Sequence, residues 1–206
     1  MLKIQNLSAG VLKDFSLEVK SGARVLLRGS NGSGKTTLVQ AILGNPDYSV
    51  TSGKIVFNGK DISKATTAER ARMGIFLGGQ SVPEIPGLSV MTLLKHSFSA
   101  HFPEIKMGDF LKKLKAAQAR LDIPDSWLGR SINVGFSGGE KKRLMFLHLL
   151  LLGPKLAILD EPDSGADPDA QKTFGEIIGE MKETAFLVIS HQEVFFKPTE
   201  TINFNS

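Results

Sequence analysis

The chain has 206 residues, which suits one domain of two lobes, and 41% of them are hydrophobic, which suffices for a buried core. It has no cysteine, which excludes disulfides and cysteine-ligated metal or iron–sulfur sites within this chain. The net charge is +4, but the cations are spread rather than gathered in a basic tail, so nucleic acid is not an expected partner.

The N-terminal third alternates apolar and polar residues, which predicts strands. The alternation covers residues 2–8 and 15–20, and a short apolar run at 23–27 leads directly into glycines. Residues 54–62 predict a strand and a turn, and residues 74–77 predict another buried strand. The first ten residues lack the apolar core of a signal peptide.

The pattern changes between about residue 81 and residue 132, where a proline-punctuated loop is followed by helical periodicity. Lysines at 112, 113 and 115 are expected on a solvated face of that helix. The residues expected to share its apolar face are Phe110, Leu111, Leu114, Ala117 and Leu121.

The remainder alternates helix and strand. We expect a helix from Glu140, a strand at 155–160, a helix from about Asp169 and a strand at 185–190. Strands alternating with helices predict an α/β fold with a largely parallel sheet. The most apolar run, residues 144–152, is far shorter than the about 20 residues that cross a bilayer, so we expect a cytoplasmic protein without direct membrane insertion.

GSNGSGKT at 29–36 matches the phosphate-loop pattern, between a predicted strand and a predicted helix. Its glycines let successive N–H groups turn toward phosphate oxygens, and the helix N-terminus adds a favourable dipole. Lys35 is expected to bridge the β- and γ-phosphates of ATP, and the Thr36 hydroxyl is expected to bind Mg²⁺. The predicted nucleotide-binding residues are Gly29, Ser30, Asn31, Gly32, Ser33, Gly34, Lys35, Thr36 and Thr37.

An acidic pair follows the apolar strand LAIL, at the edge of the sheet where ligands bind in open α/β folds. Asp160 is expected to hold Mg²⁺ through water, and Glu161 is expected to orient and polarise the attacking water. His191 ends the last predicted strand and can donate a hydrogen bond to phosphoryl charge, although a lone histidine there is often structural. Gln80 follows another strand, where its amide oxygen would contact Mg²⁺ or water, but alone it is uninformative.

NVGFSGGEKKR at 133–143 has glycines and cations suited to an anion, but no group that attacks, activates water or holds a metal cation well. Ser137, Gly138 and Gly139 precede a helix expected near Glu140, whose dipole also favours an anion. Because the chain already has one phosphate cradle, a second anion site would take its ligand from another molecule, and a two-fold dimer would supply it.

The order of these motifs, covering almost the whole chain, resembles the ATP-binding cassette (ABC) family of ATPases. The resemblance implies a single ABC ATPase domain over 1–206, with a P-loop and β core at 1–80 and 133–206 and a helical subdomain at about 81–132. It implies an ATP-dependent homodimer in which the signature residues of one subunit contact the ATP of the other. The signature residues are Ser137, Gly138, Gly139 and Glu140, and the D-loop residues are Ser164, Gly165, Ala166 and Asp167.

Within that family, several segments resemble the cassette of the SUF iron–sulfur assembly system, which is called SufC. They are residues 44–62, residues 74–89 with EIPG, residues 131–143, and DEPDSGADPDA at 160–170. This resemblance implies an ATPase subunit that works with SufB/SufD-like scaffold proteins, docked through the helical subdomain and the Gln80 loop. The alternatives are the nucleotide-binding subunit of an ABC membrane transporter and a module that binds nucleotide without hydrolysing it.

Three features depart from the expected pattern. Pro162 stands where SufC-like chains often have another residue, and no aromatic residue lies near Val11 or Leu12 to stack on adenine. Only 15 residues follow His191, whereas SufC-like chains normally continue with more strand and a helical tail; if the natural chain ends here, protection of the sheet edge and part of the partner or dimer contacts are in doubt.

Overall fold

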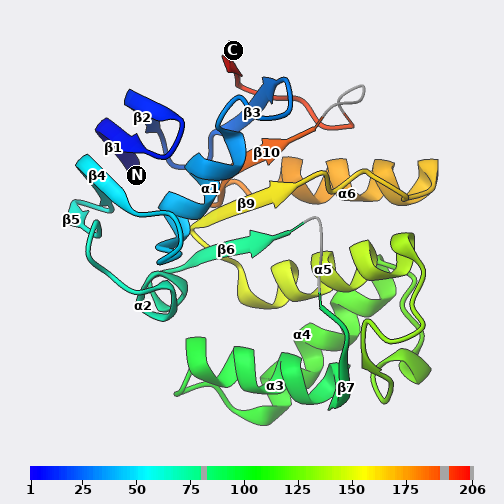
Figure 1. Cartoon of the computed structure of the whole chain (residues 1–206). Coiled ribbons are helices and arrows are strands. Elements are labelled where there is room, and N and C mark those ends of the chain that lie inside the picture. The colour runs from blue at the N-terminus through cyan, green and yellow to red at the C-terminus, as the bar shows by residue number, and fades with distance from the viewer. Residues whose placement is uncertain (80–82, 191–194, 205–206) are drawn as a thin grey trace.

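The computed structural model describes residues 1–79, 83–190 and 195–204. Within them lie an antiparallel sheet, a parallel sheet and a two-stranded ribbon (Figure 1). The predicted α/β class with an N-terminal antiparallel portion and a parallel core is confirmed. No helix in these ranges is long and apolar enough to cross a membrane.

The antiparallel sheet has the order β2-β1-β4-β5. Its strands are β1 (Leu2–Ala9), β2 (Leu12–Val19), β4 (Val50–Phe57) and β5 (Lys60–Asp61). The parallel sheet has the order β11-β3-β10-β9-β6. Its strands are β3 (Arg24–Gly29), β6 (Ile75–Gly78), β9 (Leu156–Asp160), β10 (Ala185–Ile189) and β11 (Glu200–Phe204).

The helices either pack on the parallel sheet or form a lobe beside it, and most of them were expected. They are α1 (Lys35–Leu43), α2 (Thr67–Arg72), α3 (Val90–His101), α4 (Met107–Arg120), the 3₁₀ turn Asp125–Trp127, α5 (Gly138–Leu152) and α6 (Pro168–Glu180). Figure 1 shows α3 and α4 on the far side of α5 from β9, as a helical lobe. β7 (Ile85–Ser89) precedes this lobe in the sequence and β8 (Ser131–Ile132) follows it. The two strands pair as an antiparallel ribbon, which was not predicted.

The strands β9 and β10 are buried on both faces, which separates two hydrophobic cores. Leu156 and Ile158 belong to the core under the antiparallel sheet and α1, whereas Ala157 and Leu159 belong to the core with α5, α6 and the helical lobe. This alternation follows from the two-residue period of a strand, and it explains why these strands are continuous apolar runs.

Two expectations change in the structure. Leu111 is 44% exposed, so its assignment to the apolar face of α4 was wrong; Gln118 takes a buried position there, with its amide donating to the carbonyl oxygen of Ile123. At the edge of the parallel sheet, the residues after His191 add one more strand, because β11 pairs with β3 and is the outermost strand there.

Candidate active site

The loop between β3 and α1 depends on glycine where it enters the helix. Gly34 is the N-cap of α1 with φ 105°, and a Cβ there would lie 2.7 Å from the Leu12 side chain. Both the backbone conformation and the contact therefore exclude a larger residue. The loop therefore enters α1 through a left-handed glycine packed against Leu12.

Lys35 opens α1 and is only 7% exposed. Its Nζ donates hydrogen bonds to the carbonyl oxygens of Gly29 at 2.7 Å and Ser30 at 2.8 Å. The Lys35 Nζ is therefore held against the loop that precedes the helix.

A cleft of about 320 Å³ brings the phosphate loop and the acidic pair together. It is lined by Val11, Asn31, Gly32, Gly34, Lys35, Thr36, Thr37, Asp160, Glu161 and Ile189. Gly29, Ser30 and Ser33 belong to the same loop but are not among these lining residues. Parallel pairing explains the meeting, because β3 and β9 flank β10 and all three end at one edge of the sheet.

The acids sit where the strand register predicts. Asp160 ends β9 opposite Ile189, and Glu161 follows with its backbone N–H donating to the Ile189 carbonyl oxygen at 2.8 Å. Sequence reasoning missed Lys142, which is 8% exposed and whose Nζ lies 3.4 Å from the Asp160 carbonyl oxygen. Burial lowers the pKa of Lys142, while the charges of Asp160, Glu161 and Asp163 act to raise it.

Gln80 and His191 lie outside the described residues. Their roles toward metal and phosphate therefore stay predictions. The strands that precede them, β6 and β10, end at the same edge of the sheet as β3 and β9.

The helix of the signature segment begins at Gly138, two residues earlier than expected. Ser137 is its N-cap, and its Oγ accepts from the Glu140 N–H at 3.3 Å while the Glu140 carboxylate accepts from the Ser137 N–H at 2.7 Å. The Glu140 carboxylate is therefore engaged by the Ser137 N–H of its own chain. The first-turn N–H groups of Gly138 and Gly139 and the Ser137 hydroxyl are the groups left to face an anion.

The signature and D-loop segments pack directly on each other. A Cβ on Gly139 would lie 3.1 Å from the Gly165 carbonyl oxygen, whereas a Cβ on Gly138 would meet nothing within 4 Å. Asp167 caps α6 by accepting from the Ala170 N–H at 2.8 Å. That hydrogen bond and the Arg143 guanidinium at 3.1 Å lower the pKa of Asp167.

The signature segment is also fixed to the helical lobe. Phe136 is buried, its ring packs edge-on against Trp127, and the Arg130 guanidinium lies 3.6 Å from the ring centroid. The Arg130 side chain donates to the Gly135 carbonyl oxygen at 2.8 Å. The position of the first turn of α5 is therefore coupled to the position of the lobe.

Comparison with known proteins identifies this arrangement. A sequence model described as ABC transporter matches residues 12–164. The chain belongs to the ABC transporter family.

This ABC ATPase domain covers about four fifths of the length of two relatives. It is 40% identical over 203 residues to a Streptococcus pyogenes serotype M18 protein named "Probable ABC transporter ATP-binding protein", covering 94% of this chain and 79% of that protein. It is 40% identical over 205 residues to a Synechocystis protein named "Probable ATP-dependent transporter", covering 94% and 80%. A solved structure titled "Structure of ATP binding subunit of ABC transporter" aligns with a TM-score of 0.82 and 26% identity, covering 92% of this chain and 79% of that one.

The cleft of the ABC domain offers oxygen donors of the kind that Mg²⁺ prefers. Across the described ranges, no group of three histidine or acidic side chains is arranged to hold a metal ion. Thr36 and Asp160 line the same cleft and offer a hydroxyl and a carboxylate. Mg²⁺ prefers few protein oxygens plus phosphates and water, so this sparse set fits it.

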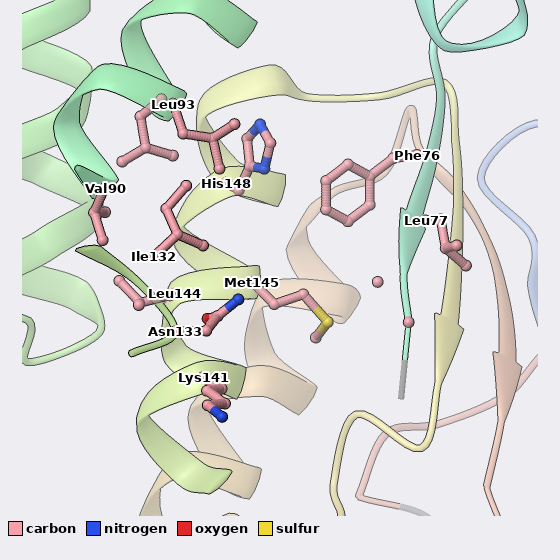
Figure 2. Close-up of a pocket in the computed structure, with 13 residues that line it drawn as sticks. Phe76, Leu77, Val90, Leu93, Ile132, Asn133, Lys141, Leu144, Met145 and His148 are labelled. Carbon is pink, nitrogen blue, oxygen red and sulfur yellow. The ribbon is translucent and has the colours of Figure 1, made fainter. Parts of the chain in front are cut away.

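A second, apolar pocket lies between the parallel sheet and the helical lobe, and sequence patterns did not reveal it. It measures about 100 Å³, and Figure 2 shows Phe76 from β6 and Met145 and His148 from α5 among its walls. Burial lowers the pKa of His148 to about 4, and its Nε2 has no hydrogen-bond partner among the described residues. The imidazole is therefore neutral near pH 7.

Proposed function

We propose that this ABC domain binds ATP in the cleft between its phosphate loop and the β9 acids and hydrolyses it to ADP and phosphate. The observation that carries the proposal is the single cleft lined by both Lys35 and the pair Asp160 and Glu161. A phosphate cradle alone supports binding. A carboxylate beside it adds a group that orients water.

We assign roles in this reaction to residues of the cleft and, from the sequence prediction, to Gln80 and His191. The loop N–H groups hold the phosphates, and Lys35 reaches the β- and γ-phosphates from its bonds to the loop carbonyls. Thr36 and Asp160 would hold Mg²⁺, with Gln80 as a further ligand. When bound, Mg²⁺ neutralises phosphate charge. Glu161 orients the attacking water, and His191 donates a hydrogen bond to the γ-phosphoryl oxygens.

Adenine recognition in this proposal is apolar rather than aromatic. Val11 is 64% exposed and lines the cleft, whereas Leu12 is buried against Gly34. The base would therefore contact the Val11 side chain, and the phosphates would supply most of the affinity.

ATP also joins two copies of the chain in this proposal. Gly138 and Gly139 begin a 15-residue helix and are not among the residues lining the chain's own cleft. In a two-fold dimer, these N–H groups and the Ser137 hydroxyl would face the γ-phosphate held by the partner copy, with the D-loop beside them. Hydrolysis would remove those contacts and loosen the dimer.

The substitution Glu161→Gln tests both parts. With ATP and Mg²⁺, we expect phosphate release to fall at least about 100-fold and the dimer fraction in light scattering to rise. Glu176→Gln, on the exposed side of α6, is the matched control and should change neither. Equal phosphate release by wild type and Glu161→Gln, with a scaffold partner present, would refute hydrolysis and favour the module that only binds nucleotide.

The finer proposal is a cytoplasmic SUF-type role, in which the domain spans 1–206 with a helical subdomain at about 81–132. Its support is the EIPG and GFSGGEKKR segments and the position of the apolar pocket beside the β6 end. ATP-driven dimerisation would remodel a SufB/SufD-like scaffold that contacts this pocket and carries the cluster ligands absent from this cysteine-free chain.

A membrane transporter subunit is the second candidate, and the printed names of the relatives favour it. The same pocket would then receive a segment of an integral membrane partner. Affinity purification from cells distinguishes the two. A soluble SufB/SufD-like partner supports the first proposal, and an exclusively integral membrane partner refutes it in favour of transport.

A further inference from the structure

The turn that carries Glu161 has a backbone conformation that needs external support. Its φ is 46°, in the left-handed region that a residue with a Cβ rarely adopts. Such residues persist only where surrounding structure holds them. One hold is the hydrogen bond from the Glu161 N–H to the Ile189 carbonyl oxygen.

A second hold acts two residues later, through Asp163. Its side chain is 3% exposed, and its Oδ2 accepts a hydrogen bond from the Ser190 Oγ at 3.0 Å; Ser190 is 1% exposed. The Asp163 backbone carbonyl oxygen accepts from the Gln171 side chain and from the Ala166 N–H, both at 3.2 Å. Ile189 and Ser190, at the end of β10, are thus hydrogen-bonded to Glu161 and Asp163.

Stability alone does not account for a carboxylate at this position. Burying an acid is costly unless its oxygens are bonded, and Asp163 Oδ1 has no hydrogen-bond partner within the described part of the chain. The Asp163 charge lies near Lys142, which is itself buried beside Asp160. A buried polar group of this kind calls for an explanation in function or in positioning.

We propose that Asp163 is a positioning residue: its bond to Ser190 clamps the turn after β9 to the end of β10 and so holds Glu161 in the cleft. The proposal rests on the proposed hydrolytic role of Glu161. Asp163 touches neither nucleotide nor water in it. The phosphate loop makes none of these bonds, so the clamp sets the hydrolysis rate and not the affinity for ATP.

Three substitutions test the clamp. Asp163→Ala and Ser190→Ala each break it, and we expect kcat to fall about 10- to 100-fold while the KM for ATP stays within about twofold. The double variant should be no slower than the slower single variant, because both remove one interaction. Asp163→Asn keeps an oxygen that accepts from Ser190 and should restore kcat to within about threefold of wild type. Asp169→Ala, an exposed acid on α6, is the control for loss of one negative charge.

A structural readout separates this test from that of the proposed function. Hydrogen exchange of the Glu161 amide, which donates to Ile189, should quicken at least about tenfold in Asp163→Ala and Ser190→Ala and remain slow in Asp163→Asn. Unchanged exchange in both alanine variants would overturn the clamp whether or not wild type hydrolyses ATP. An Asp163→Asn variant as slow in hydrolysis as Asp163→Ala would also overturn it, because a carboxylate would then be required chemically. If Asp163→Ala does not fold, Ser190→Ala and Asp163→Asn decide by the same criteria.

Discussion

His148 should make the folded ABC domain sensitive to mild acid. Its pKa is about 4 in the folded chain, against a usual value of 6.5, because burial among apolar walls disfavours the imidazolium (Figure 2). Between these two values the unfolded chain binds a proton at His148 and the folded chain does not. Stability therefore falls as pH drops through this window, and the effect is absent above about pH 7.

The size of the effect follows from the two pKa values. Protonation of His148 in the unfolded chain lowers the free energy of unfolding by about 2 kcal/mol at pH 5 and by about 3 kcal/mol near pH 4. His148→Leu removes the titrating group and keeps an apolar side chain in the pocket. We expect its free energy of unfolding to fall by about 2 kcal/mol less than that of wild type between pH 7 and pH 5.

Urea unfolding at pH 7, 6 and 5 measures this difference, because carboxylates that titrate in the same range are common to both proteins. His96→Gln is the matched control for replacing one histidine, since His96 is exposed on α3. If His148→Leu and wild type lose the same free energy between pH 7 and pH 5, the imidazole is not held neutral by burial and the argument fails.

Three further outcomes are expected. Arg70→Met should lower the free energy of unfolding by about 3 kcal/mol or more, because the buried guanidinium donates to four backbone carbonyl oxygens; exposed Arg72→Met should cost less than about 0.5 kcal/mol in the same urea titration. Gly139→Ala should lower the thermal midpoint because its Cβ would crowd the D-loop. Gly138→Ala should leave the midpoint unchanged or raise it, and it should weaken the ATP-dependent dimer in light scattering. A dimer unaffected by Gly138→Ala would count against the signature contact. Thr66→Ala should cost about 1 kcal/mol by removing the capping box of α2, and no loss in urea titration would contradict the cap.

The sequence predicts best where one local conformation must serve a fixed chemistry. The phosphate loop requires glycine at position 34 and a cation at position 35, and these are consecutive residues of a short motif that can be recognised in the sequence. The acids at 160 and 161 could be placed because an apolar strand ends at them in a parallel sheet. The meeting of these two segments follows from the strand order, in which β3 and β9 flank β10, and helix–strand alternation alone did not predict that order.

Features made by distant side chains were not predictable in the same way. Lys142 belongs to the cations of the signature segment that the sequence associates with an anion, yet in α5 it lies against the end of β9. The bond between Asp163 and Ser190 joins residues 27 positions apart, and nothing local in either segment indicates it. The cap of α2 is different, because Thr66 and Glu69 have the spacing of a capping box and that signal could have been recognised.

The alternation of β9 between two hydrophobic cores limits how this protein can change during evolution. Deleting one residue just before Ala157 would exchange the faces of the strand, sending Ala157 and Leu159 into the core now filled by Leu156 and Ile158. It would also draw Asp160 back by one position along the edge that carries the cleft. Insertions and deletions should therefore be tolerated in the surface turns, such as the one around Asn58 and Gly59, and purged from the strands that end at the site.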